Sequence, residues 1–133
     1  MIYLDANFFL FAILDVTRKG DNARKVQASI IRGKQYATTS ALALDEIMWV
    51  LIRNNKKHML RTIVEGIYSM PNLDVSDVSP TIPLLALEFI EKYGLSPRDA
   101  FHVAIMKEGK IRSIVSDDDD FDKVEWIERI PIR

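Results

Sequence analysis

The sequence predicts an α/β protein built on a parallel sheet. Short apolar runs such as Ile2–Leu4 are each followed by a helix signal, a pattern typical of buried parallel strands. Helix caps stand where such helices would begin, at Ser40 and at Ser96 with its following proline. The 133 residues are 48% hydrophobic and 28% charged, which suits one folded domain with a single substantial core. We therefore expect one domain over residues 1–133.

The elements follow in order from these signals. Asn7 can cap the first helix, Gly20 with Asp21 breaks the chain before the second, and Gly94 suits a helix C-terminus. The expected strands cover residues 2–4, 36–39, 73–75 and 111–116, with an edge strand at 126–127 or near 130. The expected helices cover residues 8–14, 21–33, 41–53, a segment ending near 69, 79–93, and a last helix starting at 96.

Several function classes are excluded by composition. The chain has no cysteine, so it can form neither a disulfide nor a thiolate metal site. Its start shows no basic segment followed by an apolar one, and no apolar run approaches the length of a membrane span. We therefore expect a cytoplasmic protein without membrane association. Five glycines leave little room for a Gly-rich phosphate loop.

The near-neutral net charge of −1 hides an uneven distribution. Residues 18–61 hold ten Lys or Arg and three Asp or Glu, whereas the rest of the chain holds eight and sixteen. This asymmetry suits a phosphate-binding surface beside an acidic metal site, and it equally suits two solvated faces. The candidates for phosphate contact are Arg18, Lys19, Arg53, Lys56 and Lys57.

Four consecutive aspartates, residues 117–120, follow the last predicted central strand directly. At roughly 4 Å, two unit charges in an effective dielectric near 20 repel by about 4 kcal/mol. Such a run either lies in water or gathers around a cation, and its oxygen ligands suit Mg²⁺, Mn²⁺ or Ca²⁺.

Three further acids stand in unusual places, although each has a simple structural explanation. Asp5 ends the first strand, where open α/β sheets bind ligands and where turn residues are also common. Glu46 lies in a nearly apolar helix and needs a partner, for which Arg53 is one candidate. Asp99 lies at the third position of a helix, where it can serve as a cap. His102, one turn later, is expected to be a packed or hydrogen-bonded histidine rather than a metal ligand.

Taken together, these segments resemble the PIN-domain nucleases, and most closely their small single-domain toxin branch, the VapC-like ribonucleases. The shared motifs are a strand followed by Asp-x-Asn, an apolar helix with Glu, Asp-Ala-x-His-x-Ala, and Ser-x-Asp-x-Asp-Phe, in this order along nearly the whole chain. The resemblance implies four catalytic acids at Asp5, Glu46, Asp99 and Asp118, an accessory acid at Asp120, and polar companions at Asn7 and Ser116.

The resemblance also implies a fold, a cofactor and partners. The fold would be a three-layer α/β/α sandwich with a parallel sheet of four or five strands. Asp5, Asp99 and Asp118 would hold Mg²⁺ or Mn²⁺, with Glu46 as a further ligand or as the group that orients the attacking water. The chain would be a homodimeric endoribonuclease, the toxin of a VapBC-type pair, acting on RNA and inhibited by an antitoxin. The alternative is a catalytically silent PIN-like module that binds RNA or protein.

Strand alternation predicts which aspartates of the run face the site. If extended geometry persists beyond Ser116, then Ser116, Asp118 and Asp120 share one face. Asp117 and Asp119 would lie on the other face, where replacing either by Asn should relieve repulsion and slightly stabilise the metal-free protein.

Other acid-dependent folds fit less well, because a haloacid-dehalogenase-type phosphatase needs a second acid where this chain has Asn7, and a receiver domain needs adjacent early acids.

Overall fold

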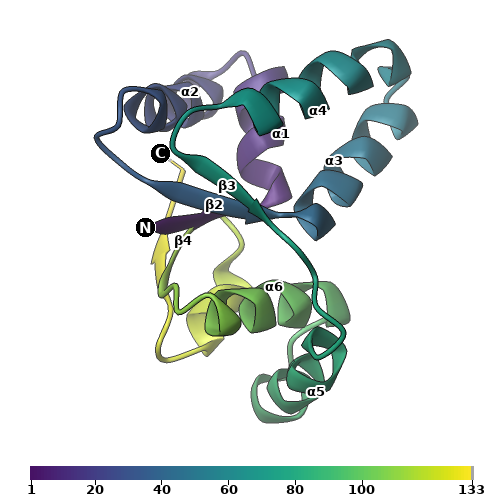
Figure 1. Cartoon of the computed structure of the whole chain (residues 1–133), viewed down its shortest axis with the longest axis vertical. Coiled ribbons are helices and arrows are strands. Elements are labelled where there is room, and N and C mark those ends of the chain that lie inside the picture. Colours follow the sequence, from purple (N-terminus) through teal and green to yellow (C-terminus); the bar gives the residue numbers. More distant parts are fainter. Residues whose placement is uncertain (133) are drawn as a thin grey trace.

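A five-stranded sheet, all parallel, lies at the centre of the molecule (Figure 1). The structure, a computed structural model, describes residues 1–132. The strand order is β3-β2-β1-β4-β5, so the first strand of the chain is the middle of the sheet. The strands are β1 (Ile2–Leu4), β2 (Ala37–Ser40), β3 (Leu73–Ser76), β4 (Ser113–Val115) and β5 (Glu128–Ile130).

Helices cover both faces of this sheet, and the predicted three-layer sandwich is confirmed. Ile2 and Leu4 pack with α1 to α4 in one core, while Tyr3 between them points into a second core formed with α5 and α6. Figure 1 shows the same division into two helical layers. The helices are α1 (Ala6–Leu14), α2 (Arg18–Ile31), α3 (Ala41–Arg53), α4 (Leu60–Ser69), α5 (Ile82–Tyr93) and α6 (Pro97–Glu108), with 3₁₀ turns η1 (Lys57–Met59) and η2 (Asp119–Lys123).

The predicted caps near the site are confirmed. The Ser40 hydroxyl accepts the Ala43 N–H at 3.2 Å and begins α3, and the Ser96 hydroxyl accepts the Asp99 N–H at 3.3 Å and begins α6. Gly94 ends α5 in the left-handed conformation, with φ of 67°. Because these caps fix the first residues of α3 and α6, they also fix the positions of Glu46 and Asp99 in those helices.

The starts of the first two helices differ from the prediction. Asp5, not Asn7, caps α1, by accepting the Phe8 N–H at 2.9 Å. The second helix begins at Arg18 and contains Gly20, which was predicted to break the chain. Glycine is needed here for close packing, because a Cβ atom at Gly20 would lie 1.9 Å from the Asp15 carbonyl oxygen.

Two further boundaries also differ. Helix α5 begins at Ile82 rather than at residue 79, because the Ser79 hydroxyl is engaged with Thr81 and Glu108. The edge strand forms around Ile130, and not at Trp126 and Ile127. Within residues 1–132, no helix is long and apolar enough to cross a membrane.

Candidate active site

The predicted site residues converge at the carboxyl ends of the central strands. Asp5 follows β1 and Ser116 follows β4, and these two strands are neighbours in the sheet. Glu46 lies in α3, which begins where β2 ends, and Asp99 lies in the first turn of α6. This edge is where parallel α/β sheets bind their ligands.

Three carboxylates form an acidic trio, which consists of Asp99, Asp118 and Asp120. One oxygen from each lies within 4.8 Å of the others, and all three residues are half-buried. Burial, followed by repulsion from Asp118, raises the pKa of Asp99 to about 6. Oxygen donors at this spacing, with charges that repel one another, fit a hard divalent cation.

The loop after β4 explains why Asp118 and Asp120 face Asp99. The Ser116 hydroxyl accepts the Asp118 N–H at 3.1 Å, and the Asp118 carboxylate accepts the Asp120 N–H at 2.9 Å. Asp118 and Asp120 thus lie on one side, next to Asp99, but the predicted extended geometry is wrong, because the chain turns into η2 at Asp119. Asp117 points away from the trio and forms an ion pair with Lys19.

Asp5 lies outside the acidic trio and close to the second group of polar residues. Its carboxyl is almost fully buried at the start of α1. Burial raises its pKa, even though hydrogen bonds from the Ser116 hydroxyl and the Phe8 N–H act in the opposite direction. The neighbouring His102 and Glu46 side chains also influence the pKa of Asp5, so these groups belong to one site.

Glu46 pairs with His102, and not with Arg53 as one interpretation suggested. The His102 Nε2 atom lies 2.5 Å from the Glu46 Oε1 atom, and the imidazole is 2% exposed. On its other side, His102 Nδ1 lies 2.6 Å from the Tyr3 hydroxyl, which in turn lies 2.8 Å from the Ser40 hydroxyl. The prediction that His102 is a hydrogen-bonded helix residue is confirmed.

Sequence reasoning did not include Tyr3 in the site. The available signal was strand alternation, because Tyr3 faces the layer opposite to Ile2 and Leu4. A phenol that points into a core needs a polar partner there, and the histidine of α6 was a candidate.

The predicted companion Asn7 is exposed at the second position of α1. Within the described residues, none of the hydrogen bonds joins its side chain to the acids. Its role beside Asp5 therefore stays a prediction, whereas Ser116 does hold the loop and Asp5.

Asp117→Asn should destabilise the protein, which corrects the expectation of relief from repulsion. Burial acts to raise the pKa of Asp117, but the ion pair with Lys19 and the Ile132 N–H at 2.7 Å hold it below its ordinary value. The ionised form thus stabilises the fold at neutral pH, and this contribution is lost as pH falls through the folded-state pKa. We expect a loss of about 1 kcal/mol at pH 7 that shrinks below about pH 4. Urea unfolding of the variant and the wild type, at pH 7 and at a pH below about 4, measures this loss of stability. Equal stability of the two proteins at pH 7 would contradict the prediction.

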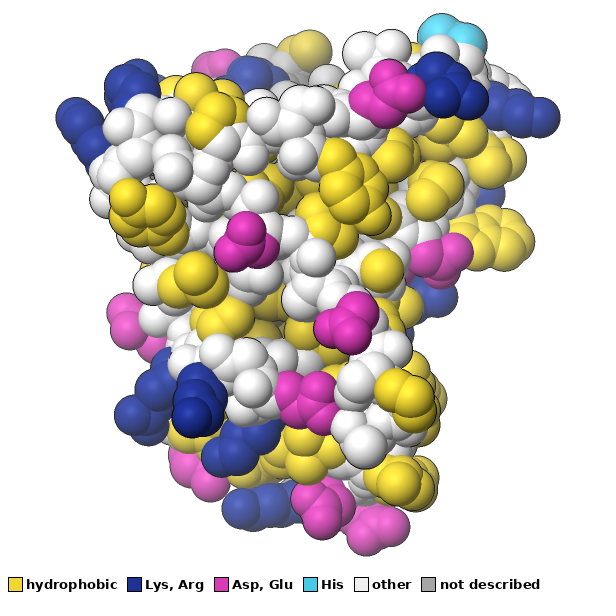
Figure 2. Space-filling view, in the orientation of Figure 1, with side chains coloured by type: hydrophobic (Ala, Val, Ile, Leu, Met, Phe, Trp, Pro, Cys, Tyr) yellow, Lys and Arg dark blue, Asp and Glu magenta, His cyan; other side chains and the backbone are white. Residues whose placement is uncertain are grey.

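The basic candidates fall into two groups. Figure 2 shows Lys and Arg side chains at two upper corners of the molecule, over α2 and over the junction of α3 and α4. Lys19 is engaged by Asp117 and lies 5.1 Å from the Phe11 ring centre. Within residues 1–132, no ion pair involves the other four, Arg18, Arg53, Lys56 and Lys57.

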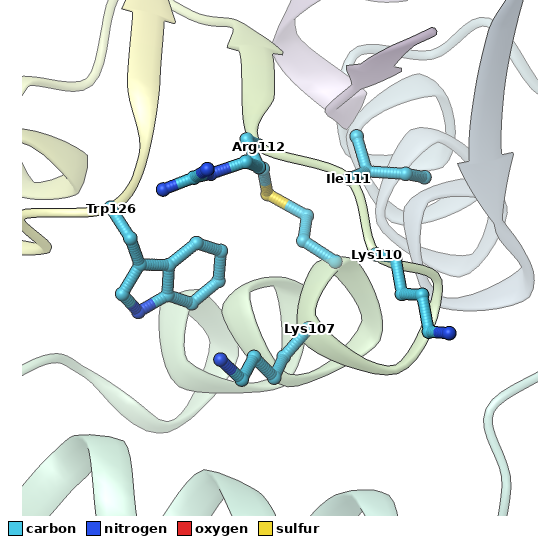
Figure 3. A pocket seen from close by; sticks show the side chains of 6 residues that line it. Lys107, Lys110, Ile111, Arg112 and Trp126 are labelled. Atoms are coloured by element: carbon cyan, nitrogen blue, oxygen red, sulfur yellow. The ribbon is translucent and has the colours of Figure 1, made fainter.

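A separate basic hollow lies at the opposite end of α6 (Figure 3). It has a volume of about 390 Å³ and is lined by Lys107, Lys110 and Arg112 together with the Trp126 indole. Lys107 lies 5.1 Å from the centre of that indole ring, and the ring of Phe89 lies 6.1 Å from the indole. Lys107 follows Asp99 by eight helical residues, so this hollow is about 12 Å along α6 from the acidic trio.

Comparisons with known proteins identify the family of the chain. The family model of the PIN domain matches residues 2–127. Ribonuclease VapC2 of Methanocaldococcus jannaschii is 28% identical over 145 residues, which cover 98% of this chain and 93% of the relative. The chain therefore matches nearly the whole length of that relative.

Two solved structures have the same fold. VapC20 of Mycobacterium tuberculosis, described as a toxin that cleaves the Sarcin-Ricin loop, gives a TM-score of 0.76 at 20% identity, covering 92% of this chain and 93% of that one. VapBC2 of Rickettsia felis, bound to promoter DNA, gives 0.77 at 17% identity and covers both chains completely. The match of the family model over nearly the entire sequence shows that this chain belongs to the PIN domain family.

Proposed function

We propose that this chain is a divalent-metal-dependent endoribonuclease and the toxin of a toxin–antitoxin pair. The observation that carries the proposal is the acidic trio, which gathers three carboxylates at the ligand-binding edge of the sheet. The relative in M. jannaschii is named a ribonuclease, and its similarity extends along the whole chain. We treat residues 1–133 as a single nuclease domain.

The chemistry follows from the donor set. Asp99, Asp118 and Asp120 would hold Mg²⁺ or Mn²⁺, with Asp5 as a further carboxylate on the adjacent strand. Such a cation supplies charge neutralisation at a phosphodiester and a bound water of lowered pKa. Glu46, which stands apart from the trio and keeps its second oxygen free of protein donors within residues 1–132, orients the water that attacks phosphorus.

The partners are proposed from solved neighbours. A structure from Klebsiella pneumoniae with a TM-score of 0.69 is described as a toxin–antitoxin complex, so we propose an antitoxin partner for this chain as well. We also propose a homodimer, which sedimentation at working concentration tests; a monomer would contradict it.

A cleavage assay tests the function directly. Antitoxin-free protein should cut at least one RNA in a broad panel that includes ribosomal and transfer RNA, with Mg²⁺ or Mn²⁺ present, and excess chelator should stop it. Cleavage that resists chelator would contradict the metal dependence. Failure on every RNA would favour the alternative, a silent PIN-like module that binds RNA or protein.

Neutralising the basic cluster at the end of α3 should weaken RNA binding. Arg53, Lys56 and Lys57 lie beyond Glu46 along α3 and are free of ion pairs within the described residues. Each phosphate contact on a single strand contributes about 0.7 to the slope of log affinity against log salt. Replacing all three by Gln should therefore lower that slope by up to about 2. Fluorescence anisotropy with a labelled RNA at several salt concentrations measures it.

The hollow of Figure 3 provides a charge-matched control. Replacing Lys107, Lys110 and Arg112 by Gln removes the same net charge at the far end of α6. This control should change the affinity only slightly and leave the slope near that of the wild type. Equal effects of the two triple variants would show that the interaction depends on net charge rather than on the surface at the end of α3.

A further inference from the structure

We propose that Ser40, Tyr3 and His102 form a hydrogen-bond chain with a fixed direction, and that this chain presents a donor to Glu46 and holds its carboxylate in place. His102 is then a positioning residue for Glu46 and does not touch the substrate. The inference deepens the proposed nuclease function and rests on it for its catalytic consequence.

The chain connects three parts of the fold that meet at the site. Tyr3 comes from the central strand β1, Ser40 from the end of β2, and His102 from α6, one turn after Asp99. Tyr3 and Ser40 have no exposed surface, and His102 is 2% exposed. The separations along the chain are 2.8, 2.6 and 2.5 Å, so every link lies within hydrogen-bond distance.

The direction of the chain follows from counting hydrogens. The Ser40 hydroxyl already accepts the Ala43 N–H at its back, and within residues 1–132 its own hydrogen has only the Tyr3 oxygen as acceptor. Ser40 therefore donates to Tyr3. The single phenolic hydrogen of Tyr3 must then go to His102 Nδ1, because this is its remaining neighbour.

The tautomer of His102 follows from this direction. Burial raises the pKa of the Tyr3 phenol, so its oxygen keeps the hydrogen that it donates. A ring nitrogen that accepts a hydrogen bond carries no hydrogen, so Nδ1 is bare and the ring hydrogen of His102 lies on Nε2. This Nε2–H donates to Glu46 Oε1, which leaves Oε2 as the free oxygen of that carboxylate.

This arrangement explains why α3 carries its acid at residue 46. Neighbouring Asp45 is exposed, whereas Glu46 turns inward and meets the imidazole. A carboxylate on a flexible side chain needs a second contact to be held in one position, and His102 provides it. Because Asp99 and His102 share a turn of α6, the acidic trio and Glu46 are held in register by the same helix.

Two replacements of His102 separate its two hydrogen bonds. His102→Gln places an amide N–H near the Nε2 position and keeps the donor to Glu46, whereas His102→Asn reaches only the Nδ1 position and keeps the contact with Tyr3. Each variant loses one of the two bonds, so the two should melt at similar temperatures. We expect His102→Gln to cleave within about fivefold of wild type and His102→Asn to lose about 100-fold in kcat at nearly unchanged KM. Equal loss in both variants would overturn the positioning role.

Glu46→Gln serves as the reference for the same pathway. It should lose at least as much kcat as His102→Asn, and adding His102→Asn to it should cause little further loss. A Glu46→Gln protein that cleaves like wild type would overturn the inference, because there would then be no catalytic group for His102 to position.

A spectroscopic measurement tests the chain without cleavage. The ¹⁵N shifts of the His102 ring in the full-length protein should show hydrogen on Nε2 and a bare Nδ1, and Tyr3→Phe should remove the donor to Nδ1 and shift that signal. A ring with hydrogen on Nδ1 in the wild type would overturn the inference. A wild type with this tautomer that cleaves no RNA would overturn the proposed nuclease instead, so the two failures are distinguishable.

Discussion

Asp118→Asn should abolish RNA cleavage while leaving the fold intact. Asp118 belongs to the acidic trio, with a carboxylate oxygen within 4.8 Å of oxygens from both Asp99 and Asp120. Asn keeps an oxygen that can accept the Asp120 N–H, so the loop after β4 should retain its shape. The variant lacks the charge that holds a cation, and removing a ligand of this kind should lower the initial rate by at least about 1,000-fold.

Asp119→Asn is the matched control, because it is the same chemical change one residue away. Asp119 is exposed and lies outside the trio, so its variant should cleave at close to the wild-type rate. Asp120→Asn should be intermediate, since Asp120 also pairs with Lys123 at 3.1 Å and lies at the margin of the site. Initial rates at one fixed metal concentration, with melting temperatures as the folding check, decide between these results. An active Asp118→Asn beside an inactive Asp119→Asn would show that the fourth acid has been misassigned.

The sheet was predictable from sequence because its strands are buried and their ends are marked by polar residues. Runs such as Ile2–Leu4 are apolar on both faces, and polar residues directly after them mark where each strand ends. Boundaries that depend on contacts between helices were not predictable. Gly20 is an example, since glycine predicts a break from local preference and is required inside α2 by the backbone of Asp15.

The acidic part of the site was also predictable, for a related reason. Acids that end strands or begin helices in a parallel sheet meet at one edge, so Asp5, Asp99 and Asp118 could be placed together without knowledge of their contacts. The pairing of Glu46 with His102 could not, because it joins residues 56 positions apart through side-chain rotamers. The ion pair between Lys19 and Asp117 is similar, and it makes one member of the aspartate run a stabilising residue.

Divalent cations should stabilise the protein most at neutral pH, and the acidic trio should account for the effect. The pKa of Asp99 is raised to about 6, by burial and by Asp118, from an unfolded value near 3.8. A raised pKa means that the carboxyl favours folding at pH values below its unfolded pKa, and that this stability is lost as pH rises through about 6. After allowance for solvent screening of a half-buried group, the cost at pH 7.5 is on the order of 1 kcal/mol, or about 4 °C in melting temperature.

Adding Mg²⁺ or Mn²⁺ at pH 7.5 should recover this loss and add the binding free energy, which is about 2.7 kcal/mol at 100 times Kd. The same addition at pH 4.5 should have little effect, because Asp99 then carries its proton. Asp99→Asn should melt higher than wild type without cation at pH 7.5, show a smaller difference at pH 4.5, and respond weakly to cation at either pH. Asp119→Asn controls for the loss of one negative charge near the loop, and it should retain the full response of the wild type. If Asp119→Asn and Asp99→Asn lost the response equally, the cation would be acting on the charge of the whole aspartate run, and the trio would not be its site.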